Sequence, residues 1–180
     1  MAHYMAIEQI ATRVLALMRE ACTQPALQTP AGLRFEQAAL AQFAPGAPPL
    51  AEGVYLVLWR VAPGSAARAL TPRRGEDGRL SRPPLPLDLH WLLLPVAPQV
   101  DRQARLLGWT LAFMHQLPVL GSELLNQDGA EVFAPHEAVE LIADPQATAE
   151  QLSLWSSGQL PPGLGYQARM VLLDAVPAAL

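Results

Sequence analysis

The chain has 180 residues, 51% of them hydrophobic and 16% charged, which fits one compact domain and argues against a two-domain enzyme. Its twelve basic residues, all of them arginine, and its sixteen acidic residues give a net charge of −4, which argues against general binding to the nucleic-acid backbone. The single cysteine, Cys22, rules out an internal disulfide and fits a reducing, cytosolic environment.

Residues 5–21 are predicted to form an amphipathic helix. Ile10, Val14 and Leu17 recur at helical spacing, while charged residues such as Arg13 fall largely elsewhere. Charges inside this apolar stretch argue against a secretory signal, and no apolar run reaches the roughly 20 residues of a membrane span. The sequence therefore predicts a soluble protein with no membrane partner. Proline interrupts residues 23–49, where a short strand or helix within 32–42 stays open.

Two apolar segments predict a hairpin-like pair of strands. Residues 53–61 are continuously apolar, as in a central strand buried on both faces. Residues 85–95 alternate, with one set of side chains on each face of a strand. One face carries Leu87, Leu89, Trp91 and Leu93, and the other carries Asp88, His90, Leu92 and Leu94.

Residues 62–84 separate these strands and are predicted to form a long exposed loop. The segment is rich in proline, glycine and serine and has no apolar periodicity. Five of the arginines lie in it: Arg68, Arg73, Arg74, Arg79 and Arg82. Long loops of this kind are commonly functional or disordered. Both interpretations stay open, a segment that reaches a neighbouring molecule and a solvated loop.

The remaining elements complete an α+β order. Residues 99–117 predict a helix buried on more than one side, and residues 137–143 predict a short strand. A helix is expected from Asp144 or Thr148 to about Ser157, followed by a last strand at 163–175. We therefore expect a single domain over residues 1–180, with a small mixed or antiparallel sheet of about four strands flanked by helices.

Few residues form a pattern associated with catalysis. Asp88 and His90 share one face of a strand and could act as an acid–base pair, although a structural pair is the more common arrangement. Cys22 would need a base brought to it in space to act as a nucleophile. No cysteine or histidine spacing typical of zinc and no phosphate-binding glycine motif occurs. The sequence thus predicts no enzyme activity, metal or cofactor.

Four stretches together resemble a known family. They are GVYLVLWRV at 53–61, GRLSRPPLPLDLHWLLLP at 78–95, RLLGWTLAFMHQLPVL at 105–120 and QLSLWSSGQLPPGLGYQARMVLLD at 151–174. In order and spacing they are similar to the tail-terminator or cap family of contractile injection systems, the phage-tail-like particles typified by virulence-cassette and antifeeding-prophage assemblies. The long segment at 62–82 departs from the family's aromatic-rich, polar character by being rich in alanine, proline and arginine.

The resemblance implies a structural subunit of such a particle. It would form a ring, expected to be a hexamer, on the end of the inner tube distal to the baseplate, where it ends tube growth and joins the tube to the sheath. The implied partners are further copies of the chain, the inner tube protein and the sheath protein. Assembly would take place in the cytoplasm, and the finished particle would be released or anchored. The arginines of residues 62–82 are then the candidates for contact with a neighbouring subunit, the tube or the sheath.

Two other classes of function stay open. One is an assembly chaperone or cargo-loading adaptor of such a particle, which would be a monomer or dimer with no stable place on the tube. The other is a small hydrolase that uses Asp88 and His90 and needs a pocket with a third polar group.

Overall fold

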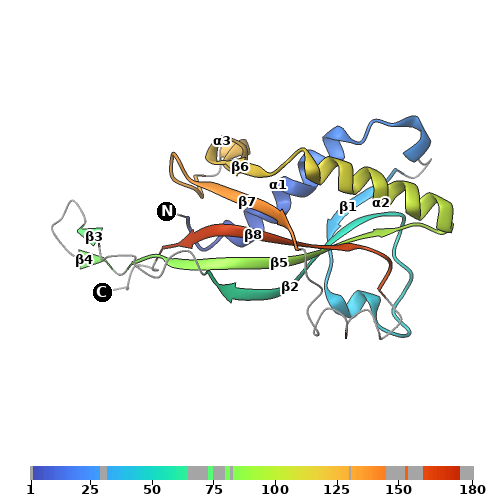
Figure 1. Cartoon of the computed structure of the whole chain (residues 1–180), viewed down its shortest axis with the longest axis horizontal. Coiled ribbons are helices and arrows are strands. Elements are labelled where there is room, and N and C mark those ends of the chain that lie inside the picture. The colour runs from blue at the N-terminus through green and yellow to red at the C-terminus, as the bar shows by residue number, and fades with distance from the viewer. Residues whose placement is uncertain are drawn as a thin grey trace.

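The computed structural model describes residues 2–28, 32–64, 73–74, 80–81, 83–129, 131–144, 153 and 160–174 of the chain. Figure 1 shows a main sheet with its two long helices on one side. In spatial order the six strands of this sheet are β1 (Arg34–Gln37), β2 (Gly53–Pro63), β5 (Leu85–Val96), β8 (Leu164–Leu173), β7 (Ala138–Ala143) and β6 (Val119–Gly121). The α-helices are α1 (Ala6–Ala21), α2 (Val100–His115) and α3 (Ser122–Leu125), and the 3₁₀ turns are η1 (Pro25–Leu27), η2 (Leu40–Phe43) and η4 (Gln127–Gly129). A separate two-stranded sheet pairs β3 (Arg73–Arg74) with β4 (Leu80–Ser81).

The main sheet has six strands, so the expectation of about four was wrong, although the mixed α+β arrangement agrees with the sequence. β1 and β2 are parallel, and the other neighbouring strands are antiparallel. The pattern missed β6, which has three residues. β1 has four residues and lies within residues 32–42, where the pattern left a strand or a helix open. Alternation over so few residues is hard to tell from a loop, and both strands follow chain that contains proline.

β2 and β5 form the hairpin-like pair that the sequence predicts. Their register runs from Gly53 opposite Val96 to Pro63 opposite Leu87. β1 accompanies β2 only as far as Leu56, whereas β5 lies between β2 and β8. Residues 53–57 of β2 are buried, and residues 58–63 are exposed or half-buried. The prediction of a strand buried on both faces therefore holds for the first half of β2 and fails for the second.

Two irregularities interrupt the ladders of the central strands. The pairing of β2 with β5 shifts between Leu58 and Arg60. In β8, Arg169 and Met170 together lie opposite the single residue Asp88 of β5, and Met170 has a positive φ of 65°. Both are β-bulges, which insert one extra residue and increase the local twist of the sheet. Both lie in the half of the sheet that leads toward β3 and β4 (Figure 1).

Alternation along β5 divides the buried residues between the two faces of the sheet, as the sequence predicts. Leu87, Leu89, Trp91 and Leu93 join the larger cluster, which also contains residues of α1 and α2. Leu92 and Leu94 join Val57 in a smaller cluster on the other face. That cluster is packed against Ala38, Leu40 and Phe43 in and before η2, and also against Trp59 of β2 and Leu160 before β8.

α1 occupies the range expected from its apolar spacing. Ile10, Val14 and Met18 are buried against the sheet at helical intervals. Arg13 differs from the expected polar face, because it is only 4% exposed. Its Nε donates a hydrogen bond to the carbonyl oxygen of Leu124, 2.9 Å away, and a further nitrogen contacts the side chain of Gln127. Arg13 therefore fastens α1 to α3 and the turn that follows it.

α2 is buried along one stripe, which corrects the prediction of burial on more than one side. Leu106, Thr110 and Met114 are its buried residues, and they recur every four positions. Its other aromatic and aliphatic side chains are half-buried or exposed. Arg102 lies one turn before Leu106 on the same side of the helix. It pairs with Glu52 and donates a hydrogen bond to the carbonyl oxygen of Leu27 at 2.8 Å.

The predicted strands near the C-terminus are confirmed as β7 and β8. Of the helix expected from residue 144 or 148 to about 157, the structure describes only Asp144 and Ser153, so the rest lies outside the described residues. Ala2 pairs with the end of β8, because its N–H donates to the carbonyl oxygen of Leu172 and its carbonyl accepts from Asp174, each at 2.9 Å. Within the described part of the chain, no helix has both the length and the apolarity required to cross a membrane.

Candidate interaction surface

The arginine-rich segment is residues 62–84, and its described strands β3 and β4 lie beyond the far end of the ribbon formed by β2 and β5 (Figure 1). β2 continues into the segment as far as Pro63, and β5 begins at Leu85. Arg73 and Arg74 form β3, with Arg73 opposite Ser81 and Arg74 opposite Leu80. The expected loop thus contains a short pair of strands. Arg68, Arg79 and Arg82 lie outside the described residues.

The base of this segment is firmly held. The N–H of Gly64 donates to the carbonyl oxygen of Pro86 at 2.9 Å, which extends the β2–β5 ladder by one rung. On the other side of β5, Leu85 lies opposite Leu173 of β8. Three adjacent strands therefore support the point where residues 65–82 leave the sheet.

The outer edge of β2 is open beyond the end of β1. Among the described residues, positions 58–63 of β2 have a strand partner only in β5. Leu58 is 39% and Val61 46% exposed, and Arg60 between them is also exposed. An unpaired strand edge that carries apolar side chains is a template for pairing with another chain.

The opposite end of the sheet has a second open edge. β6 pairs with β7 only at residues 138–140, and the N–H of Leu141 donates to the carbonyl oxygen of Pro118 at 2.8 Å. Beyond that point the described residues provide no strand partner on this side of Ile142 and Ala143. A hollow of about 420 Å³ adjoins this edge, lined by Met114, His115, Pro118, Val119, residues 140–143 and Tyr166.

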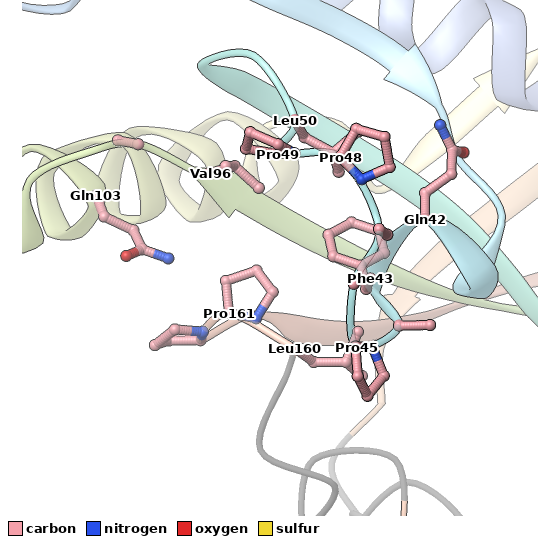
Figure 2. A pocket seen from close by; sticks show the side chains of 15 residues that line it. Gln42, Phe43, Pro45, Pro48, Pro49, Leu50, Val96, Gln103, Leu160 and Pro161 are labelled. Carbon is pink, nitrogen blue, oxygen red and sulfur yellow. The ribbon is translucent and has the colours of Figure 1, made fainter.

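A larger hollow of about 580 Å³ lies between η2 and the chain leading into β8 (Figure 2). Phe43 and Leu160 project into it beside several prolines, and Gln103 of α2 faces it from the opposite wall. None of the residues that line it is charged. Such a lining offers no ion pair to a charged ligand.

Asp88 and His90 lie on the same face of β5, as expected, but the structure gives His90 other neighbours. Its ring packs edge-on against Trp59, with centroids 5.9 Å apart, and its Nδ1 lies 3.8 Å from Oδ2 of Asp144. Asp88 is 8% exposed. Neither of the two hollows is lined by Asp88 or His90. The arrangement links β5 to the end of β7 and to β2, as in a structural contact.

Cys22 is a buried residue that completes the C-terminus of α1. Its N–H donates to the carbonyl oxygen of Met18 at 3.0 Å, and its own carbonyl accepts from the side chain of Gln28 at 2.7 Å. Burial raises the pKa of the Cys22 thiol, which lowers the thiolate fraction at neutral pH. In the described part of the chain, His, Cys, Asp and Glu side chains do not gather in threes to form a metal site.

A family model described as the Pvc16 N-terminal domain matches residues 15–179. The chain belongs to this family. The match covers the main sheet, α2, the C-terminal part of α1 and the arginine-rich segment. Comparison with the curated proteins finds no match.

The same fold occurs in a solved structure, "Cryo-EM Structure of an Extracellular Contractile Injection System, PVC sheath/tube terminator in extended state". The TM-score is 0.57 at 16% sequence identity. The alignment covers 94% of this chain and 57% of the other, so this member of the Pvc16 N-terminal domain family spans little more than half of the terminator's length.

The sequence pattern locates the arginine-rich segment at the end of a hairpin but misses the two open edges. It assigns Leu58 and Val61 to a buried strand, because continuous apolarity does not show where a neighbouring strand stops. A signal is present at Arg60, the one charged residue in that stretch, which natural sheets often place on exposed edges. The edge at Ile142 depends on the three-residue length of β6, which no sequence pattern shows.

Proposed function

We propose that this chain is a structural subunit of a contractile injection system, in which it forms a hexameric ring on the end of the inner tube distal to the baseplate. The ring stops addition of further tube subunits and joins the tube to the sheath. The observation that carries this proposal is the match of the Pvc16 N-terminal domain family over residues 15–179. The fold shared with a sheath/tube terminator supports the same role.

The arrangement of the sheet suits such a subunit. A ring needs one surface of each copy to bind a different surface of the next, so that a repeated rotation closes the assembly. The sheet has two open edges, and the β2–β5 ribbon presents the arginine-rich segment away from the helices (Figure 1). In this proposal Arg68, Arg73, Arg74, Arg79 and Arg82 contact a neighbouring subunit, the tube or the sheath, because guanidinium groups bind carboxylates in a planar, two-pronged geometry.

The test is the state of assembly, alone and with tubes. Six chains of 19.4 kDa each give about 116 kDa, so light scattering on a sizing column separates a free hexamer from a monomer. The protein is then mixed with purified inner tubes, and gold-labelled copies are located in negative-stain images. The proposal expects label at one end of each tube and a fixed tube length when the protein is present during polymerisation. Label along the whole tube, or none, would refute it and favour the chaperone or adaptor.

A further inference from the structure

The outer edge of β2 has backbone groups that point away from the sheet. In an antiparallel ladder, successive residues point alternately toward the partner strand and away from it. The N–H of Gly64 points to β5, so Ala62 does too, and the N–H and carbonyl of Val61 point outward. Among the described residues, no strand lies on that side of Val61. This part of β2 can therefore accept a further strand.

The same alternation describes the outer edge of β6, at the opposite side of the sheet (Figure 1). The carbonyl of Pro118 and the N–H of Ser122 are both bonded to β7. Leu120 therefore points to β7 as well, and the N–H groups of Val119 and Gly121 point away from it. β6 is the last strand of the sheet in the described part of the chain, and a Cβ added to Gly121 would meet nothing within 4 Å. A strand can thus be added outside β6 while the pairing of β6 with β7 is kept.

The order of the strands favours a parallel pairing of these two edges. Four antiparallel steps lead from β2 through β5, β8 and β7 to β6, so β2 and β6 run in the same direction. In a ring of six, neighbouring copies are related by a rotation of about 60°, which does not reverse the direction of a strand. Placing β2 of one copy beside β6 of the next therefore favours a parallel pair.

One parallel register matches the donors of these edges with acceptors. With Val61 aligned with Leu120, the N–H of Val61 reaches the carbonyl of Val119. The N–H of Gly121 then reaches the carbonyl of Val61. Gly121 is also the N-cap of α3, so its carbonyl turns to the helix, and Pro63, which would face that carbonyl, has no N–H. The edge of β2 thus lacks a donor where the edge of β6 lacks a free acceptor.

This register also keeps the two faces of the sheet continuous. Leu120 belongs to the larger core cluster, and Val61 lies opposite Leu89 of the same cluster, so both side chains are on the side of the long helices. Val61 is 46% exposed in the single chain and would be covered by the added strand. On the other face, Ala62 would lie beside Gly121.

The parts of the chain that follow the two strands carry opposite charges. Residues 62–84 contain five arginines and two acidic residues, a net charge of +3. Residues 118–144 contain six acidic residues and no arginine, a net charge of −6 with histidine neutral. In a parallel pair both strands end on the same side, so the chain after Pro63 leaves β2 beside the chain after Gly121. Opposite charges at an interface favour the correct partner and register.

We propose that β2 of one copy pairs in parallel with β6 of the next copy, with Val61 beside Leu120, so that the sheets of neighbouring subunits join. This inference rests on the proposed ring and names its subunit interface. The two edges are different surfaces of one chain, so the contact is heterologous and passes from copy to copy until the ring closes. β6 keeps its hydrogen bonds to β7 in this arrangement.

A pair of cysteines tests the contact directly. β2 and β6 are separated by β5, β8 and β7, about 19 Å at the usual spacing of strands, whereas the two Cα atoms of a disulfide lie within about 7 Å. Ala62→Cys together with Gly121→Cys can therefore form a disulfide only between copies. After mild oxidation of the assembled protein, we expect a ladder of covalent oligomers that ends at the hexamer.

Single variants separate the possible geometries. Ala62→Cys and Gly121→Cys should each stay uncrosslinked alone and should form dimers only when the two proteins are mixed. A matched control combines Ala62→Cys with Val100→Cys, because Val100 is 84% exposed at the start of α2 and lies on neither edge. Dimers of Ala62→Cys alone would overturn the proposal by showing a symmetric contact of β2 with β2.

A proline in β6 gives a second test that does not depend on disulfide geometry. Gly121 has a φ of −73°, which proline adopts, and the N–H that proline removes is the one that points away from β7. Gly121→Pro should lower the hexamer fraction at least tenfold and keep the far-UV circular dichroism of the unaltered protein. Gly121→Ala retains the N–H, is the matched control and should assemble normally. Equal assembly of the two variants would contradict the bond to Val61.

The outcomes distinguish a failed interface from a failed function. If the unaltered protein forms rings, but the double-cysteine protein never crosslinks within them and Gly121→Pro assembles normally, this interface is refuted and the proposed function stays intact. Failure of the unaltered protein to form rings, alone or on tubes, would refute both.

Discussion

Arg13 of α1 and Leu124 of α3 are joined by a hydrogen bond of 2.9 Å from Nε of Arg13 to the Leu124 carbonyl oxygen. The two residues are 111 positions apart in the sequence, and the arginine is 4% exposed. α3 precedes β7, whose end forms one of the two open edges. The position of that edge relative to the helices therefore depends on the buried Arg13 side chain, which connects α1 to α3.

Removing the Arg13 guanidinium should destabilise the protein. Arg13→Met keeps much of the side-chain volume but leaves the carbonyl oxygen of Leu124 without its partner, a loss of about 1–3 kcal/mol for a hydrogen bond to a charged group. Urea unfolding followed by far-UV circular dichroism measures the change. Arg19→Met is the matched control: it also loses a hydrogen bond, to the carbonyl oxygen of Phe35, but from an exposed residue. Equal losses in the two variants would contradict the role given to Arg13.

Gly53 should tolerate no side chain, because a Cβ at this position would meet the backbone carbonyl of Arg34 in β1. Gly53→Ala has to displace β1 or overpack the contact, which costs about 1–3 kcal/mol. Gly108→Ala on α2 has open space around the added methyl group and removes a helical glycine, so it should raise stability by about 0.5–1 kcal/mol. Opposite signs in thermal unfolding are the expected result. A stabilised Gly53→Ala protein would show that β1 does not lie against β2 as described.

Cys22 should react slowly with a thiol reagent until the protein unfolds. Burial raises the pKa of this thiol, and burial also raises the pKa of the hydroxyls of Tyr55 and Tyr166. A folded-state pKa above the unfolded value means that the contribution to stability is complete below the unfolded pKa and is lost as pH rises through the folded pKa. The protein should therefore lose stability above about pH 9, where the unfolded thiol and then the unfolded phenols ionise. Rapid labelling of the folded protein at neutral pH would contradict the burial of Cys22.

Replacing the arginines of the ribbon should abolish capping without unfolding the domain. The variant changes Arg68, Arg73, Arg74, Arg79 and Arg82 to alanine together. The main sheet does not depend on these residues for its strand pairing, so the melting temperature should stay within a few degrees of the original. The measurement is the fraction of tubes with a labelled end. A variant with Arg34 and Arg105 changed to alanine, both outside the arginine-rich segment, is the control. Unchanged ring formation and tube capping would refute a role for these arginines.

The sequence predicts those parts of the fold whose pattern is long and local. The alternation of residues 87–94 assigns each side chain of β5 to the correct face, and the spacing of Ile10, Val14 and Met18 locates α1. These patterns are readable because burial repeats with the period of the strand or helix. The two strands that flank the arginine-rich segment are also predicted, with β2 ending at Pro63 and β5 beginning at Leu85.

The rest depends on contacts between distant segments. β1 and β6 are too short to show alternation, and the exposure of Leu58 follows from where β1 ends rather than from any feature of residue 58 itself. The helical pattern assigns Arg13 to the solvent because nothing near it in sequence indicates the carbonyl of Leu124. Whether such a residue is buried is decided by a partner far away in the sequence, in this case 111 residues away.

The two bulges in β2 and β8 set the direction in which the ends of β2 and β5 extend beyond the rest of the sheet. Each inserts a single residue, at Leu58–Arg60 of β2 and at Arg169–Met170 of β8, close to where residues 65–82 depart. Deleting one residue at either place would reverse which side chains face each side of the strand beyond it and would reduce its twist. The direction in which β2 and β5 lead the chain out of the sheet therefore depends on these two bulges, and the gain or loss of one residue at either of them would change it.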